Sequence, residues 1–233
     1  MKTLVMTALE GELGALPEKL GARPLQGGPR GVRSFSGGYM ACSGVGKRRT
    51  LSFLDNFLRS GLSMDRLIVA GYAGALHASL KGGDLVVAES VTAAPGGGPV
   101  LKASYRETIA PLAEGGSRVW IVRGVTSDTL CGPEEKGSLA EWGEFVDMES
   151  YHALLWAEDN GIEASVVRAV SDPLGMVFPP PEIWRIPWKR LSWGGLAKAS
   201  LKNRSVLFDL LSFRRNLRRA TLSLEGALES ILT

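Results

Sequence analysis

An acidic side chain follows a buried strand near the middle of the C-terminal half, where it could serve chemistry. Residues 163–170 are almost all apolar and rich in β-branched side chains, which is typical of a strand buried on both faces of a sheet. The apolar run stops at Ser171, Asp172 and Pro173. Open α/β sheets bind their ligands at the carboxyl ends of such strands, so Asp172 is a candidate site residue. The alternative is structural, because Asp followed by Pro is also an ordinary helix start.

Other strand ends along the chain carry acids or glycines. They are Glu10 and Glu12, Gly44 to Gly46, Gly71 to Gly74, and Asp147 with Glu149. If their strands are parallel neighbours, all of them meet Asp172 at one edge of the sheet. Each also has a structural interpretation, because glycines form turns and a helix dipole favours acids in the first turn. The Gly-Val-Gly segment lacks the Lys-Ser/Thr ending of a P-loop and the third glycine of a dinucleotide fingerprint, so it only weakly indicates phosphate binding.

The elements that must position these residues alternate between strands and helices. Strand patterns cover residues 2–8, 39–43, 67–70, 85–88, 119–125 and 145–146, and helical patterns follow several of them, one ending at Gly61. Alternating strands and helices predict an α/β fold with a largely parallel sheet. Glycine-rich turns at 27–38 indicate hairpins, which make the sheet mixed. We therefore expect a three-layer α/β/α sandwich with a mixed central sheet, as a single domain over residues 1–233.

The composition excludes several classes of protein. With 233 residues and 45% hydrophobic side chains, the chain can bury a sizeable core. Two cysteines and two histidines leave little material for a disulfide framework, a metal site or a histidine-based triad, so we expect no metal. The N-terminal apolar run meets Glu10 and Glu12 too early for a signal peptide, and no window of about 18 apolar residues could span a membrane. These features predict a soluble, cytoplasmic protein.

Six short motifs stand in a fixed order along the first 175 residues. They are Ala8-Leu9-Glu10-Gly11-Glu12, Ser43-Gly44-Val45-Gly46-Lys47, Gly71-Tyr72-Ala73-Gly74, Leu80-Lys81-Gly82-Gly83-Asp84-Leu85-Val86-Val87, Val146-Asp147-Met148-Glu149 and Val167-Arg168-Ala169-Val170-Ser171-Asp172. Together they resemble the nucleoside phosphorylase superfamily, and most closely its 5′-methylthioadenosine/S-adenosylhomocysteine nucleosidase branch. The resemblance implies a nucleoside phosphorylase-like fold, a small nucleoside as substrate, no cofactor, and a homodimer.

The resemblance also implies a division of labour among the acids. Asp172 matches the residue that protonates N7 of the leaving base, which requires a carboxylic acid with a pKa raised toward neutrality, and Ser171 matches its support. Glu149 matches the carboxylate that binds the 2′ and 3′ hydroxyl groups and favours the positive charge developing on the sugar, with Met148 against the ribose. Glu12 matches the residue that orients and deprotonates the attacking water, much as two acids share the work in glycosidases. The other positions that the resemblance assigns to substrate binding are Tyr72, Gly74, Leu130, Cys131 and Val146.

These matches predict hydrolysis of the N-glycosidic bond of a 5′-substituted adenine nucleoside. Phosphorylases of the superfamily instead hold phosphate with arginines and glycine loops. The N-terminal segment here carries Glu12 and no Gly-x-Pro-x-Arg loop, which favours water as the nucleophile, while Arg30 in Gly-Pro-Arg keeps phosphorolysis as the alternative. Outside enzymology, the alternative is a nucleoside-binding protein without activity, against which Asp172, Glu149 and Glu12 argue.

Two departures from the family pattern concern the substrate. Leu130 stands where an aromatic ring usually stacks on adenine, and losing such a stack forfeits on the order of 1–3 kcal/mol. Tyr72 replaces a small residue, so that it either crowds the site or supplies a hydroxyl group. The base is therefore either held differently or is a different base.

The segment 176–233 departs most from the family. From Pro181 to the end it holds ten Lys or Arg and only four acids. Three tryptophans are interleaved with basic residues at Trp184, Arg185, Trp188, Lys189, Arg190 and Trp193, and a later helix places Leu217, Ala220, Leu224, Leu228 and Ile231 on one face.

We expect this terminal helix to pack on the sheet with its basic face in solvent. The alternative is association with a membrane surface, with tryptophans at lipid headgroups and arginines toward anionic lipid. The segment also resembles the hopanoid-biosynthesis branch of the superfamily, which implies cleavage of adenine from an adenosylated lipid as a further alternative. No base-reading motif supports a nucleic acid as partner.

Overall fold

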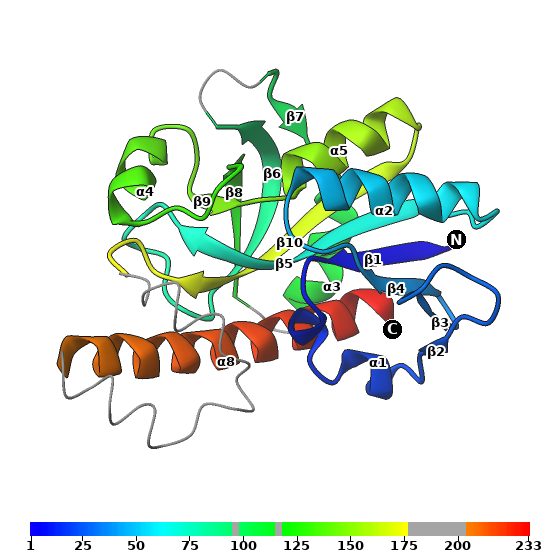
Figure 1. The fold of residues 1–233 in the computed structure, drawn as a ribbon, viewed down its shortest axis with the longest axis horizontal. Coiled ribbons are helices and arrows are strands. Elements are labelled where there is room, and N and C mark those ends of the chain that lie inside the picture. Colours follow the sequence, from blue (N-terminus) through cyan, green and yellow to red (C-terminus); the bar gives the residue numbers. More distant parts are fainter. Residues whose placement is uncertain (95–97, 115–117, 177–203) are drawn as a thin grey trace.

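The computed structural model describes residues 1–94, 98–114, 118–176 and 204–233, with side chains described from residue 211 onward in the last range (Figure 1). The strands are β1 (Thr3–Thr7), β2 (Arg23–Pro24), β3 (Arg33–Phe35), β4 (Gly38–Cys42), β5 (Arg66–Ala75), β6 (Leu85–Ala93), β7 (Leu101–Lys102), β8 (Val119–Thr126), β9 (Phe145–Asp147) and β10 (Glu163–Asp172). The helices are η1 (Glu10–Leu13), α1 (Leu16–Lys19), α2 (Lys47–Arg59), α3 (Arg106–Glu114), α4 (Pro133–Leu139), α5 (Ser150–Asp159) and α8 (Arg204–Leu232).

The sheet is mixed, as expected, and part of it closes on itself. Strands β4, β1, β5 and β10 are parallel neighbours, so their carboxyl ends share one edge. Beyond β10 the pairing continues through β6, β8 and β9, and β9 returns to pair antiparallel with β5. The sequence did not predict this closed ring. In this ring, β9 runs antiparallel to β5 and lies on the opposite side of β5 from β10.

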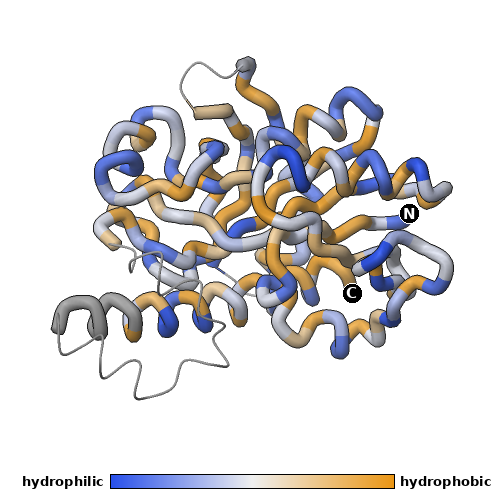
Figure 2. The backbone as a smooth tube through the Cα atoms, in the orientation of Figure 1, coloured by the Kyte–Doolittle hydropathy of each residue, from blue (hydrophilic) through white to orange (hydrophobic). Residues whose placement is uncertain are grey.

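Helices cover both faces of the sheet, which confirms the three-layer arrangement. Figure 1 shows α2 and α5 on one side and α8 on the other. Neighbouring strand residues alternate between two cores, as the pleat requires. Leu4 and Met6 of β1 face Phe57 of α2, while Val5 between them belongs to the core under Leu224 of α8. In Figure 2 the hydrophobic colour runs along these central strands, which are buried on both faces.

The terminal helix α8 packs on the sheet in the way that its periodicity predicts. Ala220, Leu224 and Leu228 are fully buried against the central strands. Its arginines at 214, 215, 218 and 219 are exposed, so the basic face is in solvent. The tryptophans at 184, 188 and 193 lie outside the described residues. Within the described ranges, no helix combines the length and apolar composition that crossing a membrane requires.

β5 and β6 are longer than expected, β6 because it extends from the predicted residues 85–88 to Ala93, and β10 is irregular near its end. The sequence predicts that β5 ends at Ala70, yet it continues through Gly71 and Gly74 to Ala75, because β10 pairs with both glycines and β9 pairs with Gly74 from the other side. β10 contains an irregularity in its pairing with β5, where Val170 pairs with Ala73 and Asp172 pairs with Gly74. Ser171 is the extra residue, and such a bulge re-aims the side chains at a strand end.

Candidate active site

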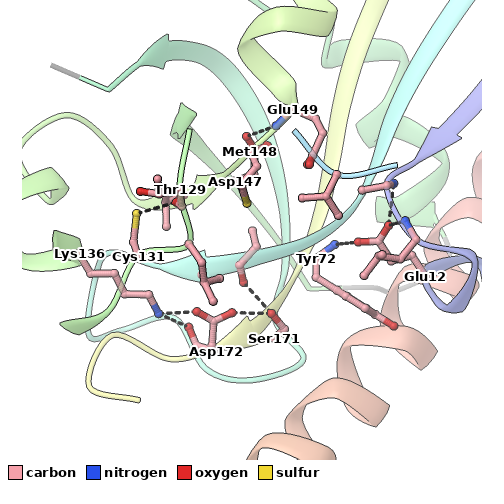
Figure 3. A pocket seen from close by; sticks show the side chains of 17 residues that line it. Glu12, Tyr72, Thr129, Cys131, Lys136, Asp147, Met148, Glu149, Ser171 and Asp172 are labelled. Carbon is pink, nitrogen blue, oxygen red and sulfur yellow. Dashed lines mark hydrogen bonds and ion pairs between the residues drawn. The ribbon is translucent and has the colours of Figure 1, made fainter. Parts of the chain in front are cut away.

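One cavity of about 420 Å³ lies where these strand ends meet (Figure 3). All ten side chains or backbone positions that the sequence predicts for the site line it: Glu12, Tyr72, Gly74, Leu130, Cys131, Val146, Met148, Glu149, Ser171 and Asp172. The cavity is also lined by Ala8, Leu9, Val45, Ala73, Thr129, Lys136 and Asp147. Its volume falls in the range of pockets that enclose small molecules. In Figure 3, Asp172 and Lys136 lie on one side of the cavity and Glu12 on the other.

Glu12 is held by backbone amides on the side of β1 and β5. Its Oε2 accepts hydrogen bonds from the N–H groups of Ala8 (2.8 Å) and Leu9 (2.7 Å), and its Oε1 accepts one from Tyr72 (2.9 Å). Because it is buried, its pKa is raised to about 7, although Arg168 and these amides oppose the rise. The neighbouring acid Glu10 is exposed, so only Glu12 is part of the cavity. A carboxyl group with a pKa near neutrality can take up and release a proton at working pH.

Glu149 and Asp147 leave the end of β9 with different tasks. Asp147 Oδ1 accepts hydrogen bonds from the backbone N–H of Glu149 (3.3 Å) and of Ser150 (3.2 Å), so it is Asp147 that fixes the start of α5. Glu149 instead turns inward, and its Oε1 accepts a hydrogen bond from the Gly46 N–H at 2.9 Å. Burial raises the pKa of Glu149, and Arg168 opposes this rise.

Arg168 supports this acidic side of the site from within the sheet. It is 1% exposed, and its Nη2 lies 2.8 Å from Asp147 Oδ2 and 3.5 Å from Glu149 Oε2. The sequence shows it as the one charged residue inside an apolar strand. A buried cation requires such partners, and here they are the two acids that follow β9.

Asp172 and Ser171 lie at the end of β10, where the bulge turns them toward the cavity. Ser171 Oγ donates a hydrogen bond to Asp172 Oδ1 at 2.5 Å. The described residues that follow, from Pro173 to Met176, form a turn closed by a hydrogen bond from the Met176 N–H to the Pro173 carbonyl (3.0 Å). No helix starts at Pro173, so the interpretation of Asp172 as a helix cap is wrong.

Two glycines of β5 leave room for these side chains. A Cβ at Gly71 would lie 2.7 Å from Glu12 Oε1, and one at Gly74 would lie 2.6 Å from Asp172 Oδ2. Gly71 also has a φ of +151°, a backbone conformation that residues with a side chain rarely adopt. The glycines are therefore required by close approach, one for each side of the cavity, and not by a turn.

Lys136 is the site residue that sequence reasoning missed. It comes from α4, is fully buried, and its Nζ lies 2.5 Å from Asp172 Oδ2. The one signal in the sequence is weak: Lys136 stands three residues before Leu139, which is buried on the same helix face. Arg30, the residue that kept phosphorolysis open, is exposed and does not line the cavity. Among the described residues, no group of three or more His, Cys, Asp or Glu side chains is arranged to hold a metal ion.

Comparison with protein families identifies the fold's relatives. A family model described as the phosphorylase superfamily matches residues 2–177. The chain belongs to the phosphorylase superfamily. A search of curated protein sequences finds no match.

Solved structures with the phosphorylase superfamily fold cover nearly the whole chain. The native futalosine hydrolase of Helicobacter pylori is 17% identical with a TM-score of 0.71, covering 99% of this chain and 97% of its own. The 5′-methylthioadenosine/S-adenosylhomocysteine nucleosidase of the same organism, with butyl-thio-DADMe-Immucillin-A, gives the same values. The corresponding nucleosidase of Colwellia psychrerythraea, in complex with adenine, is 20% identical with a TM-score of 0.70, covering 100% and 94%. At these identities the likeness shows the fold.

Two cavity residues depart from the pattern expected for this superfamily. Tyr72 does not fill the cavity with its ring, which leans against α8 in Figure 3. Its hydroxyl group lies 2.6 Å from Thr221 Oγ1 and 3.2 Å from the carbonyl oxygen of Gly11, to which it donates. Leu130 is 58% exposed at the edge of the cavity, where an aromatic ring was expected.

Proposed function

We propose that the protein hydrolyses the N-glycosidic bond of a 5′-substituted adenine nucleoside and releases the base. The observation that carries the proposal is the convergence of three buried carboxyl groups, those of Glu12, Glu149 and Asp172, on one cavity. They come from three elements far apart in the sequence. Cleaving this bond needs a proton donor for the leaving adenine, a hydrogen-bond acceptor for the sugar hydroxyls and a general base that deprotonates water. The three carboxyl groups supply these three roles.

Asp172 gives its proton to N7 of the base as the C1′–N9 bond breaks and its electron pair moves to the purine. Ser171 holds Asp172 Oδ1 through its hydroxyl group and so orients the acid. Leu130 and Cys131 line the same side and contact the base through apolar surface. Because Leu130 stands where an aromatic ring was expected, the base lacks the stacking contact at this position, which is worth on the order of 1–3 kcal/mol.

Glu149 accepts hydrogen bonds from the 2′ and 3′ hydroxyl groups, with Met148 against the ribose. Its negative charge favours the oxocarbenium-like sugar of the transition state. Glu12 takes a proton from the water that attacks C1′. Its pKa of about 7 supports this role, because a general base works best when its pKa lies near the operating pH.

The charges around the cavity support water over phosphate as the nucleophile. Its described lining holds four acids, Glu12, Asp147, Glu149 and Asp172, and its one cation there is Lys136, which pairs with Asp172. No arginine lies in that described lining. A doubly charged phosphate would enter against this negative field at a cost of several kcal/mol per like-charge contact.

The test is release of free adenine from 5′-methylthioadenosine, measured in phosphate-free buffer and again with phosphate added. The proposal expects adenine and a free sugar in both, at equal rates. A rate that depends on phosphate, with a sugar 1-phosphate as product, would favour phosphorolysis instead. Binding without turnover of any adenine nucleoside would contradict the enzyme proposal and favour a binding protein.

A further inference from the structure

Lys136 is a buried lysine whose charge has no role in the function proposed so far. Its relative exposure is 0%, and burying an ammonium group is costly unless it is paired and hydrogen-bonded. Its Nζ donates to Asp172 Oδ2 at 2.5 Å, to the Asp172 carbonyl oxygen at 3.0 Å and to the Pro173 carbonyl oxygen at 3.3 Å. These contacts tie α4 to the turn after β10, next to the base side of the cavity (Figure 3).

The contacts fix the Asp172 carboxyl group from both ends. Ser171 binds Oδ1 and Lys136 binds Oδ2, so neither oxygen can swing away from the cavity. Gly74 makes the arrangement possible, because a Cβ there would lie 2.9 Å from Lys136 Cε as well as 2.6 Å from Asp172 Oδ2. A catalytic group that is held in place by its neighbours loses less rate to misorientation.

The charge of Lys136 matters at the moment when the base leaves. As the proton moves from Asp172 to N7, the carboxyl group becomes a carboxylate, and negative charge grows on the purine as it departs. An ammonium group 2.5 Å away stabilises that carboxylate, and it does so more strongly in a dry site than in water. If Lys136 were absent, the other described acids of the cavity would repel the negative charge that forms on Asp172.

We propose that Lys136 is a positioning residue for the leaving-group step, which holds Asp172 toward the base and stabilises the carboxylate that remains after proton transfer. This inference rests on the proposed function. The atoms balance once Asp172, which the ion pair with Lys136 shows as a carboxylate, has taken up a proton from solvent: that proton goes to the base, the C1′–N9 pair goes to the purine, and Lys136 keeps its own protons. A lysine with a purely structural role would tie α4 to β10, and its loss would slow the cleavage of all substrates alike, whether or not their leaving group needs a proton.

The experiment compares leaving groups that differ in their need for a proton. Lys136→Met keeps the length of the side chain and removes its charge. Against 5′-methylthioadenosine, kcat should fall by about 10²-fold or more, the range of general acid catalysis, with KM changed only a few-fold. Against 4-nitrophenyl riboside, whose phenolate leaves without protonation, kcat should stay within about threefold of wild type. If the wild type does not cleave that compound, 6-chloropurine riboside replaces it and should show a smaller loss than 5′-methylthioadenosine.

Two further variants keep the outcome decisive. Lys136→Arg retains the charge and should recover at least about a tenth of wild-type kcat, whereas Lys136→Gln, which can still fold as a neutral donor, should behave like Lys136→Met. Lys81→Met removes an exposed lysine outside the cavity and serves as control. Equal losses on both leaving groups, or none on either, would overturn the role of Lys136 alone. A wild type inactive on every nucleoside would overturn the proposed function.

Discussion

At the scale of single residues, Glu12 is an acid whose buried environment strongly changes its pKa. It is 3% exposed, and burial raises its pKa to about 7 despite three backbone hydrogen bonds and the nearby Arg168. A carboxyl group in this state has consequences for activity and for stability, and Glu10 provides a matched control because it is exposed in the same turn.

The activity should follow the ionisation of Glu12. As a base it must be deprotonated, so kcat/KM for 5′-methylthioadenosine should rise about tenfold per pH unit on the acidic limb and bend at about pH 7, while the need for a protonated Asp172 limits the rate at higher pH. Glu12→Gln should lose about 10²-fold or more of kcat, and Glu10→Gln should stay near wild type. Steady-state kinetics between pH 5 and 9 measures both. A wild-type rate for Glu12→Gln would contradict the role of Glu12.

Stability should change with pH in the opposite direction. The folded protein holds the Glu12 proton more tightly than the unfolded chain, so the stabilisation is complete below about pH 4.5 and is lost as pH rises through about 7. The unfolding free energy of wild type should therefore fall relative to that of Glu12→Gln across this window, by an amount on the order of 3 kcal/mol. Urea unfolding at several pH values measures it. A constant difference would show that Glu12 has an ordinary pKa.

At the scale of elements, β5 is the strand on which both sides of the site depend. Gly74→Ala places a methyl group against Asp172 and Lys136, so kcat should fall by about tenfold or more while the protein stays folded. Gly137→Ala in α4 is the control, because nothing lies within 4 Å of its Cβ position. It should be active and more stable by about 0.5–1 kcal/mol, since alanine suits a helix better than glycine. Kinetics and thermal unfolding distinguish the two variants, and full activity of Gly74→Ala would contradict the close approach.

The helix α8 supplies much of the core on one face of the sheet. Leu224 is fully buried, so Leu224→Ala should cost about 2–5 kcal/mol of unfolding free energy. Leu222, two residues earlier, is 59% exposed, and Leu222→Ala should change stability by no more than about 0.5 kcal/mol. Chemical denaturation measures both. Equal effects would mean that the helix does not pack through this face.

Sequence patterns predicted some of these elements well and others not at all. The acids Glu12, Glu149 and Asp172 were found because each follows a strand, and α8 was found because its apolar residues recur with helical spacing. Lys136 was missed because it stands in an ordinary charged helix, 36 residues away from its partner Asp172. The full length of β5 was missed because glycines usually end strands, and only the approach of Glu12 and Asp172 explains why they continue this one.

At the scale of the whole molecule, long-range pairing decides where the site forms. β10 pairs with both β5 and β6, and β9 returns to pair with β5. These pairings close a ring of strands in the part of the sheet where the cavity lies. No local pattern carries that information, because it depends on partners far along the chain. Four of the predicted strand ends meet as parallel neighbours would, but the end of β9 arrives in the antiparallel direction.

Association with a membrane surface stays a prediction for the chain as a whole. From Ala220 to Leu228 the apolar face of α8 is occupied by the sheet, so binding through the described part of this helix would rest on its exposed arginines and on Leu211 and Leu222. Flotation of the full chain with vesicles, with and without anionic lipid, tests it. Co-flotation only with anionic lipid would support the membrane hypothesis, and its absence would reject it.

The predicted homodimer is tested by light scattering.

The central claim is that Asp172 gives the leaving base its proton, and one comparison tests it most directly. Adenine release from 5′-methylthioadenosine is followed in single-turnover experiments with wild type and with Asp172→Asn, alongside calorimetric binding. Asp172→Asn should bind the nucleoside within a few-fold of wild type and release adenine at least about 10²-fold more slowly. Release at the wild-type rate would contradict the claim.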